Sequence, residues 1–224
     1  MLFRSSSQNT IHEYSRYEDN RCRSESKKFQ LPGIIVLIIT FLNSHAITAG
    51  EHDHHKAPNK KSYTISYPLI KISDISMSNT ENKTVRLLDE LNKGPVVVNF
   101  IFTSCTAICP ILSSTFSQIQ KRFDQLNNKN ISLISFSIDP ERDTPARLKE
   151  YAAKFNAGDR WNFYTGTVAN MRSIENMFGN YRGNKMNHLP YTFIRMNKDS
   201  QWIRLKGFVS ASVIIDEINK ASLK

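Results

Sequence analysis

The residues best suited to chemistry are two cysteines, Cys105 and Cys109, in the segment Thr103-Ser-Cys-Thr-Ala-Ile-Cys-Pro110. They follow a β-branched and aromatic run at 96–102 and precede apolar residues at helical spacing, so a buried strand is expected to turn into a helix here. The free N–H groups and positive dipole end of a helix N-terminus favour thiolate over thiol. We therefore expect a reactive pair, able to exchange disulfides or to hold one metal ion. A purely structural disulfide is the alternative, although it would close a very short loop and stabilise little.

A single histidine could complete such a metal site. The chain has six histidines, and His188 is the only one after residue 55. An isolated histidine is more often an ordinary surface or core residue, so its role depends on whether the fold brings it to the cysteines. Two thiolates and one imidazole would form a soft donor set that suits copper, especially Cu(I). Zinc usually takes a fourth ligand, and residues 63–224 contain no further cysteine or histidine.

The pattern of apolar residues indicates which elements position these side chains. Strands are expected at 96–102, at 131–138 and at 162–164, with one or two more within 65–75 and a turn at 79–82. Helices are expected at 108–126, from the cap Thr144-Pro145 through Phe155, at 168–178 and at 211–218. Residues 191–196 and 202–205 predict a hairpin around the turn 197–200.

This order predicts an α/β protein with a thioredoxin-like fold. Its central mixed sheet would be flanked by helices, with an N-terminal β extension. In such a fold the chain that enters the hairpin passes beside the cysteine loop. The predicted fold would therefore bring His188 to Cys105 and Cys109.

Two motifs together resemble the Sco/SenC family, which are copper-binding thioredoxin-like proteins that assist assembly of cytochrome c oxidase. They are the segment from Phe102 to Pro110, with its CxxxCP pattern, and the segment Ser137-Ile-Asp-Pro-Glu-Arg-Asp-Thr-Pro145. The resemblance runs from about Ile65 to the C-terminus and implies that Cys105, Cys109 and His188 are the ligands of one copper ion. It also implies that Asp139 tunes or shields the site, although Asp139 could equally belong to a plain turn before a helix.

The resemblance implies a metallochaperone whose partner is the copper-centre subunit of cytochrome c oxidase or another periplasmic copper protein. A thiol–disulfide oxidoreductase, with Cys105 as nucleophile and Cys109 as resolving thiol, is the main alternative. A membrane-tethered copper sensor or scaffold is a third, and a peroxidase is more distant because Cys105 has no peroxidase-type motif around it.

Three regions are expected along the chain. Residues 1–49 are an N-terminal extension with a signal peptide or anchor, because basic residues precede the apolar run at 31–42 and small residues follow it. Residues 50–62 are a His-rich flexible linker, in which His52, His54 and His55 could gather a metal weakly or simply be solvated. Residues 63–224 form the Sco/SenC-like domain. The protein is thus expected to be exported to the periplasm, where it is either released or anchored to the inner membrane.

The length and composition suit one compact domain plus an extension, and the charge pattern predicts no nucleic-acid binding. The formal net charge is +10, but the basic residues are spread among acidic ones, and no basic patch with interleaved aromatic residues is evident. The excess of basic residues either forms an ordinary solvated surface or steers the protein toward an acidic partner or an anionic membrane. We expect a monomer.

Overall fold

The computed structural model describes residues 62–126 and 130–223. The predicted signal or anchor, Cys22 and the linker histidines lie outside the described residues, so those predictions stay open. Within the described ranges, no helix has the length and apolar character needed to cross a membrane.

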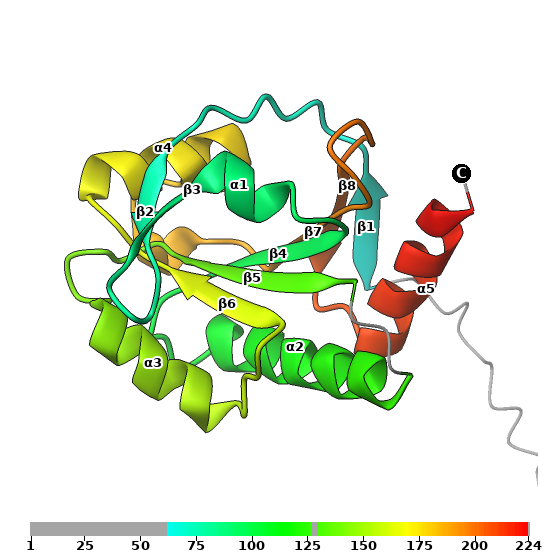
Figure 1. Cartoon of the computed structure of the whole chain (residues 1–224), viewed down its shortest axis with the longest axis horizontal. Coiled ribbons are helices and arrows are strands. Elements are labelled where there is room, and N and C mark those ends of the chain that lie inside the picture. The colour runs from blue at the N-terminus through cyan, green and yellow to red at the C-terminus, as the bar shows by residue number, and fades with distance from the viewer. Residues whose placement is uncertain (1–61, 127–129, 224) are drawn as a thin grey trace, which may run out of the picture. The chain divides into compact units, whose positions relative to one another are not determined.

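A six-stranded mixed sheet forms the centre of the fold (Figure 1). Its strands, in the spatial order β1-β8-β7-β4-β5-β6, are β1 (Tyr63–Ser66), β8 (Ile203–Gly207), β7 (Tyr191–Arg195), β4 (Val96–Ile101), β5 (Ser132–Ser137) and β6 (Trp161–Tyr164). Strands β4, β5 and β6 run parallel, whereas β7, β8 and β1 pair antiparallel with their neighbours. Every residue of β4 is buried, as expected for a central strand covered on both faces.

Helices cover both faces of this sheet. Helices α1 (Leu87–Leu91) and α4 (Val168–Met177) lie on one face, and α2 (Ile108–Gln125) and α3 (Pro145–Lys154) lie on the other (Figure 1). Helix α5 (Ala211–Ser222) packs beside α2, and a small hairpin of β2 (Ser76–Ser78) and β3 (Thr84–Arg86) packs against α4. The predicted α/β class, with a mixed sheet flanked by helices, is confirmed.

The predicted helices near the cysteines form for the expected local reasons. The Thr144 side chain accepts a hydrogen bond from the Arg147 N–H, and Pro145 occupies the first position of α3. On α2 the inner stripe Leu112, Phe116, Ile119 and Phe123 is buried. The helix expected at 108–126 ends one residue earlier, because α2 ends at Gln125 and Leu126 is 57% exposed.

The expectation of strands across residues 65–75 is largely wrong. Only the end of β1 falls in this range, and residues 67–75 cross from β1 to β2 without strand structure (Figure 1). Pro68 has no N–H to donate to a ladder, while Ile70, Ile72 and Ile75 pack against the core from outside the sheet. The regular spacing of these apolar residues therefore reflects partial burial of their side chains, and not pairing of the segment within a sheet. The short elements β2, β3 and α1 were not predicted, and the division of the chain into three regions stays a prediction.

Candidate metal and thiol site

Strand pairing brings together residues that are far apart in the sequence. Cys105 lies in the loop between β4 and α2, and Cys109 is the second residue of α2. His188 caps the short 3₁₀ turn Lys185–Asn187, three residues before β7. Because β7 is antiparallel to β4, with Asn99 opposite Thr192, the chain just before β7 meets the chain just after β4. His188 thus reaches Cys109 across 79 positions of sequence.

The three side chains converge at one point. The Sγ atoms of Cys105 and Cys109 and a ring nitrogen of His188 all lie within 4.8 Å of one another. Cys109 Sγ lies 3.5 Å from His188 Nε2 and accepts a hydrogen bond from the Phe102 N–H at 3.4 Å. Cys109 and His188 are buried, Cys105 is half-buried, and both thiols are free. The group has the geometry to hold a metal ion.

The pKa values of the two thiols are shifted in opposite directions. Partial burial of Cys105 raises its pKa, but the backbone N–H groups of Cys109, Ala107 and Ile108 outweigh this and lower the pKa below its ordinary value. The Cys109 N–H lies 3.4 Å from Cys105 Sγ, as expected for a sulfur at a helix N-terminus. Deep burial raises the pKa of Cys109 well above the ordinary range of a thiol. The accessible thiol is thus the acidic one, and the buried thiol keeps its proton.

The surroundings of His188 favour the neutral form of its imidazole. Burial lowers its pKa, and the ring packs edge-on against Phe102 with centroids 5.5 Å apart. Its Nδ1 atom is buried and has no hydrogen-bond partner among the described residues. Since a metal ligand must be unprotonated, this state is the one that can coordinate.

The segment from Asp139 to Pro145 fastens the loop that carries Cys105. The Asp143 carboxylate is fully buried, accepts hydrogen bonds from the N–H and hydroxyl of Thr103, and accepts another from the Ser137 hydroxyl at 2.7 Å. It therefore joins the carboxyl ends of β4 and β5 just before the cysteine loop. Sequence reasoning missed this role. The available signal was the presence of the polar residues Thr103 and Ser137 at the ends of two adjacent buried strands. Polar groups in such positions need a hydrogen-bond partner.

Asp139, the other acid of this segment, is buried and pairs with Lys185 of the turn before His188, at 2.5 Å between Oδ2 and Nζ. Asp139 and His188 also line a polar hollow of about 320 Å³ beside the site. The structure thus places Asp139 next to the ligand group without making it a member of it.

A family model described as SCO1/SenC matches residues 72–221, which is about two thirds of the chain. The chain belongs to the SCO1/SenC family. A SCO1 protein homolog of Bacillus subtilis (strain 168) is 38% identical over 98 residues, covering 43% of this chain and 49% of the relative. The chain spans about half the length of the curated relatives it matches.

Solved SCO1/SenC structures share the fold. BsSco, described with a disulfide switch and as a member of the Sco family of cytochrome c oxidase assembly proteins, matches with a TM-score of 0.58 and 26% identity. That match covers 70% of this chain and 96% of BsSco. ScoI of Arabidopsis thaliana with copper bound matches with a TM-score of 0.57 and 19% identity, covering 66% of this chain and 96% of that one.

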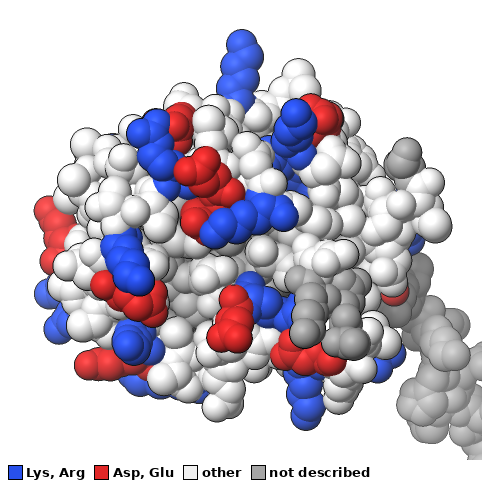
Figure 2. All heavy atoms as spheres, in the orientation of Figure 1, with Lys and Arg blue, Asp and Glu red and all other residues white. Residues whose placement is uncertain are grey.

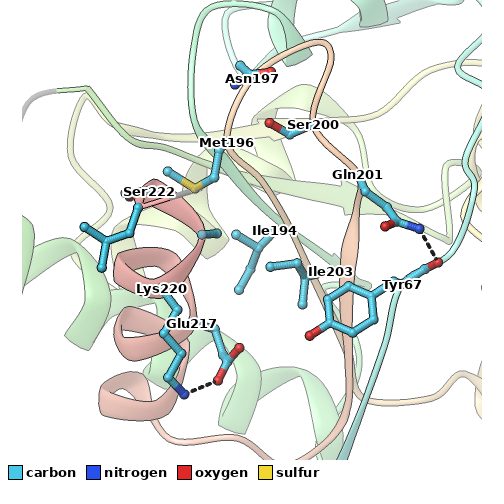
Figure 3. Close-up of a pocket in the computed structure, with 12 residues that line it drawn as sticks. Tyr67, Ile194, Met196, Asn197, Ser200, Gln201, Ile203, Glu217, Lys220 and Ser222 are labelled. Atoms are coloured by element: carbon cyan, nitrogen blue, oxygen red, sulfur yellow. Dashed lines mark hydrogen bonds and ion pairs between the residues drawn. The ribbon is translucent and has the colours of Figure 1, made fainter.

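A second hollow, bounded by described residues and larger than the one beside the site, lies away from the thiols. It measures about 900 Å³ and lies between the C-terminal end of α5 and the β7–β8 turn, where Gln201 bonds the Tyr67 carbonyl and Lys220 pairs with Glu217 (Figure 3). None of the described residues that line it is a cysteine or a histidine. The β7–β8 turn is at the amino end of β4, whereas the cysteines follow its carboxyl end. Size therefore does not identify the reactive site here.

The surface charge of the domain is mixed on the face shown in Figure 2, where acidic and basic side chains lie side by side. This matches the interspersed charges of the sequence.

Proposed function

We propose that this protein binds one copper ion through Cys105, Cys109 and His188 and delivers it to the copper-centre subunit of cytochrome c oxidase. The observation that carries the proposal is the convergence of two thiols and a neutral imidazole within 4.8 Å. Membership of the family, the copper bound in ScoI and the oxidase-assembly description of BsSco support it.

The residues present fit a soft metal ion. Thiolate sulfur and imidazole nitrogen are donors that suit copper, Cu(I) in particular, and His188 Nε2 faces Cys109 Sγ at 3.5 Å. Copper is the cargo here. Binding requires deprotonated thiols, so uptake releases protons from the buried Cys109 in particular. The half-buried Cys105 is the sulfur that a partner's cysteine can reach, which makes it the point of exchange.

A copper(I) titration tests the three-ligand site. With the fully reduced protein and a competing chromophoric chelator, His188→Ala should weaken binding at least about tenfold, because one of three ligands is lost. Asn187→Ala is the matched control, because its side chain is exposed on the same turn, and it should bind like wild type. Equal affinity in His188→Ala and wild type would overturn the assignment of His188.

The unequal acidities of the thiols favour a second function, reduction of a partner's disulfide. The Cys105 thiolate would attack one partner sulfur, form a mixed disulfide and release the other partner sulfur as a thiolate. Cys109 would then lose its proton and attack Cys105 Sγ, releasing the second partner thiol and leaving a Cys105–Cys109 disulfide. Reduction of a model disulfide should stop in Cys105→Ser and persist in His188→Ala. Wild-type protein that reduces no disulfide would count against this function.

We place the protein in the periplasm, with the segment at 31–42 as a cleaved signal or a membrane tether. Mass spectrometry of the mature protein separates these forms. An N-terminus near Ala46 or Ala49 would show cleavage and would weaken the third candidate, a membrane-tethered copper sensor.

A further inference from the structure

The turn that carries His188 is attached to the domain by one charged side chain. Lys185 begins the 3₁₀ turn, and its Nζ lies 2.5 Å from Asp139 Oδ2 just after β5. The Asp139 side chain is 7% exposed and that of Lys185 is 31% exposed, so the pair is partly shielded from water. The ammonium also lies 5.7 Å from the centroid of the Phe102 ring, and the same ring packs edge-on against His188.

The turn is closed by two backbone hydrogen bonds of its own and has little burial. The Asn187 N–H donates to the Asn184 carbonyl, and the His188 N–H donates to the Lys185 carbonyl. None of Lys185, Met186 and Asn187 is buried, and Met186 is 69% exposed. In the described part of the chain, the Lys185–Asp139 pair is the only side-chain hydrogen bond or ion pair that joins residues 184–187 to another segment.

We propose that Lys185 is a positioning residue, which holds the His188 imidazole against Cys109 by anchoring this turn to Asp139. The inference rests on the proposed copper site, because only then does the position of His188 matter for function. Without the anchor, the imidazole should spend less time 3.5 Å from Cys109 Sγ. Outer residues that orient a metal-ligating histidine commonly change metal affinity by about 10- to 100-fold.

The charge of Lys185 affects copper affinity in the direction opposite to its positioning effect. A cation near the site repels a copper ion, and its removal would leave the carboxylate of Asp139 uncompensated. If Lys185 acted only through its charge, Lys185→Met would therefore bind copper more tightly. Positioning predicts weaker binding, so the direction of the change separates the two effects.

The test compares Lys185→Met, Lys185→Arg and the control Lys149→Met in the full-length reduced protein. Lys149 is exposed on α3 and has the same charge. In the copper(I) competition assay we expect Lys185→Met to lose about tenfold or more in affinity, whereas Lys185→Arg, which can still pair with Asp139, and Lys149→Met stay near wild type. Unchanged or tighter binding in Lys185→Met would overturn the proposal.

A second readout uses the metal-free protein. Imidazole ¹H–¹⁵N NMR signals of His188, assigned by their loss in His188→Ala, should move toward those of a solvent-exposed histidine in Lys185→Met and return in Lys185→Arg. Signals identical to wild type in Lys185→Met would refute positioning. Failure of wild-type protein to bind copper would refute the proposed function instead, and the NMR comparison would still decide the role of Lys185.

Discussion

Replacing Asp143 by alanine should destabilise the protein by about 2–4 kcal/mol, because it removes the acceptor of a buried hydrogen-bond network. The carboxylate is fully buried and accepts hydrogen bonds from three donors, which are the Thr103 N–H, the Thr103 hydroxyl and the Ser137 hydroxyl. A buried donor left without an acceptor costs about 1–3 kcal/mol. The two hydroxyls can rotate toward other acceptors, whereas the backbone N–H of Thr103 cannot. Burial of the Asp143 carboxylate is itself unfavourable and raises its pKa. Removing the carboxylate therefore offsets part of the lost stability.

Urea unfolding followed by tryptophan fluorescence measures this change, since Trp161 and Trp202 are both buried. A lower midpoint with an unchanged slope would give the loss in the free energy of unfolding directly. Asp143→Asn keeps the shape and one acceptor oxygen, so it should lose about 1 kcal/mol less than Asp143→Ala. Asp216→Ala on the exposed face of α5 is the control and should stay within about 0.5 kcal/mol of wild type. A loss below about 1 kcal/mol for Asp143→Ala, or one equal to that of Asp216→Ala, would refute the reasoning.

The remaining predictions concern titration and thiol reactivity. Burial raises the pKa of Glu175 to about 7, above its unfolded value near 4.5, so the folded state binds the extra proton and stability should fall as pH rises between these values. Glu175→Gln should remove that fall and stabilise the protein at pH 8 by about 1–3 kcal/mol in urea unfolding, whereas Glu150→Gln on the surface should do neither. In a Cys22→Ser background, iodoacetamide should alkylate Cys105 at least about tenfold faster than Cys109, with a pH midpoint below that of a free thiol. Equal labelling of the two cysteines, read by mass spectrometry after short exposure, would contradict the acidities derived from the site.

Local patterns in the sequence were sufficient for the elements around the site. The continuous apolar run of β4, the stripe of α2 and the Thr144-Pro145 cap each report interactions within one element or one turn. The same patterns failed for residues 67–75, because partial burial against a core produces apolar spacing without a paired strand. The position of Cys105 and Cys109 at a strand–helix junction was also readable, since it needs only the change of periodicity beside them.

The sequence by itself therefore determined an α/β fold, a dithiol at a strand–helix junction and the candidacy of His188. Only the tertiary structure decided that the antiparallel pairing of β7 with β4 brings His188 to 3.5 Å from Cys109. It also decided the unequal acidities of the two thiols, the anchoring of Thr103 by Asp143, and the pairing of Asp139 with Lys185. Periodicity reports which face of an element is buried, but contacts between distant segments depend on strand order and on the depth of each group. Those quantities exist only once the whole sheet has formed.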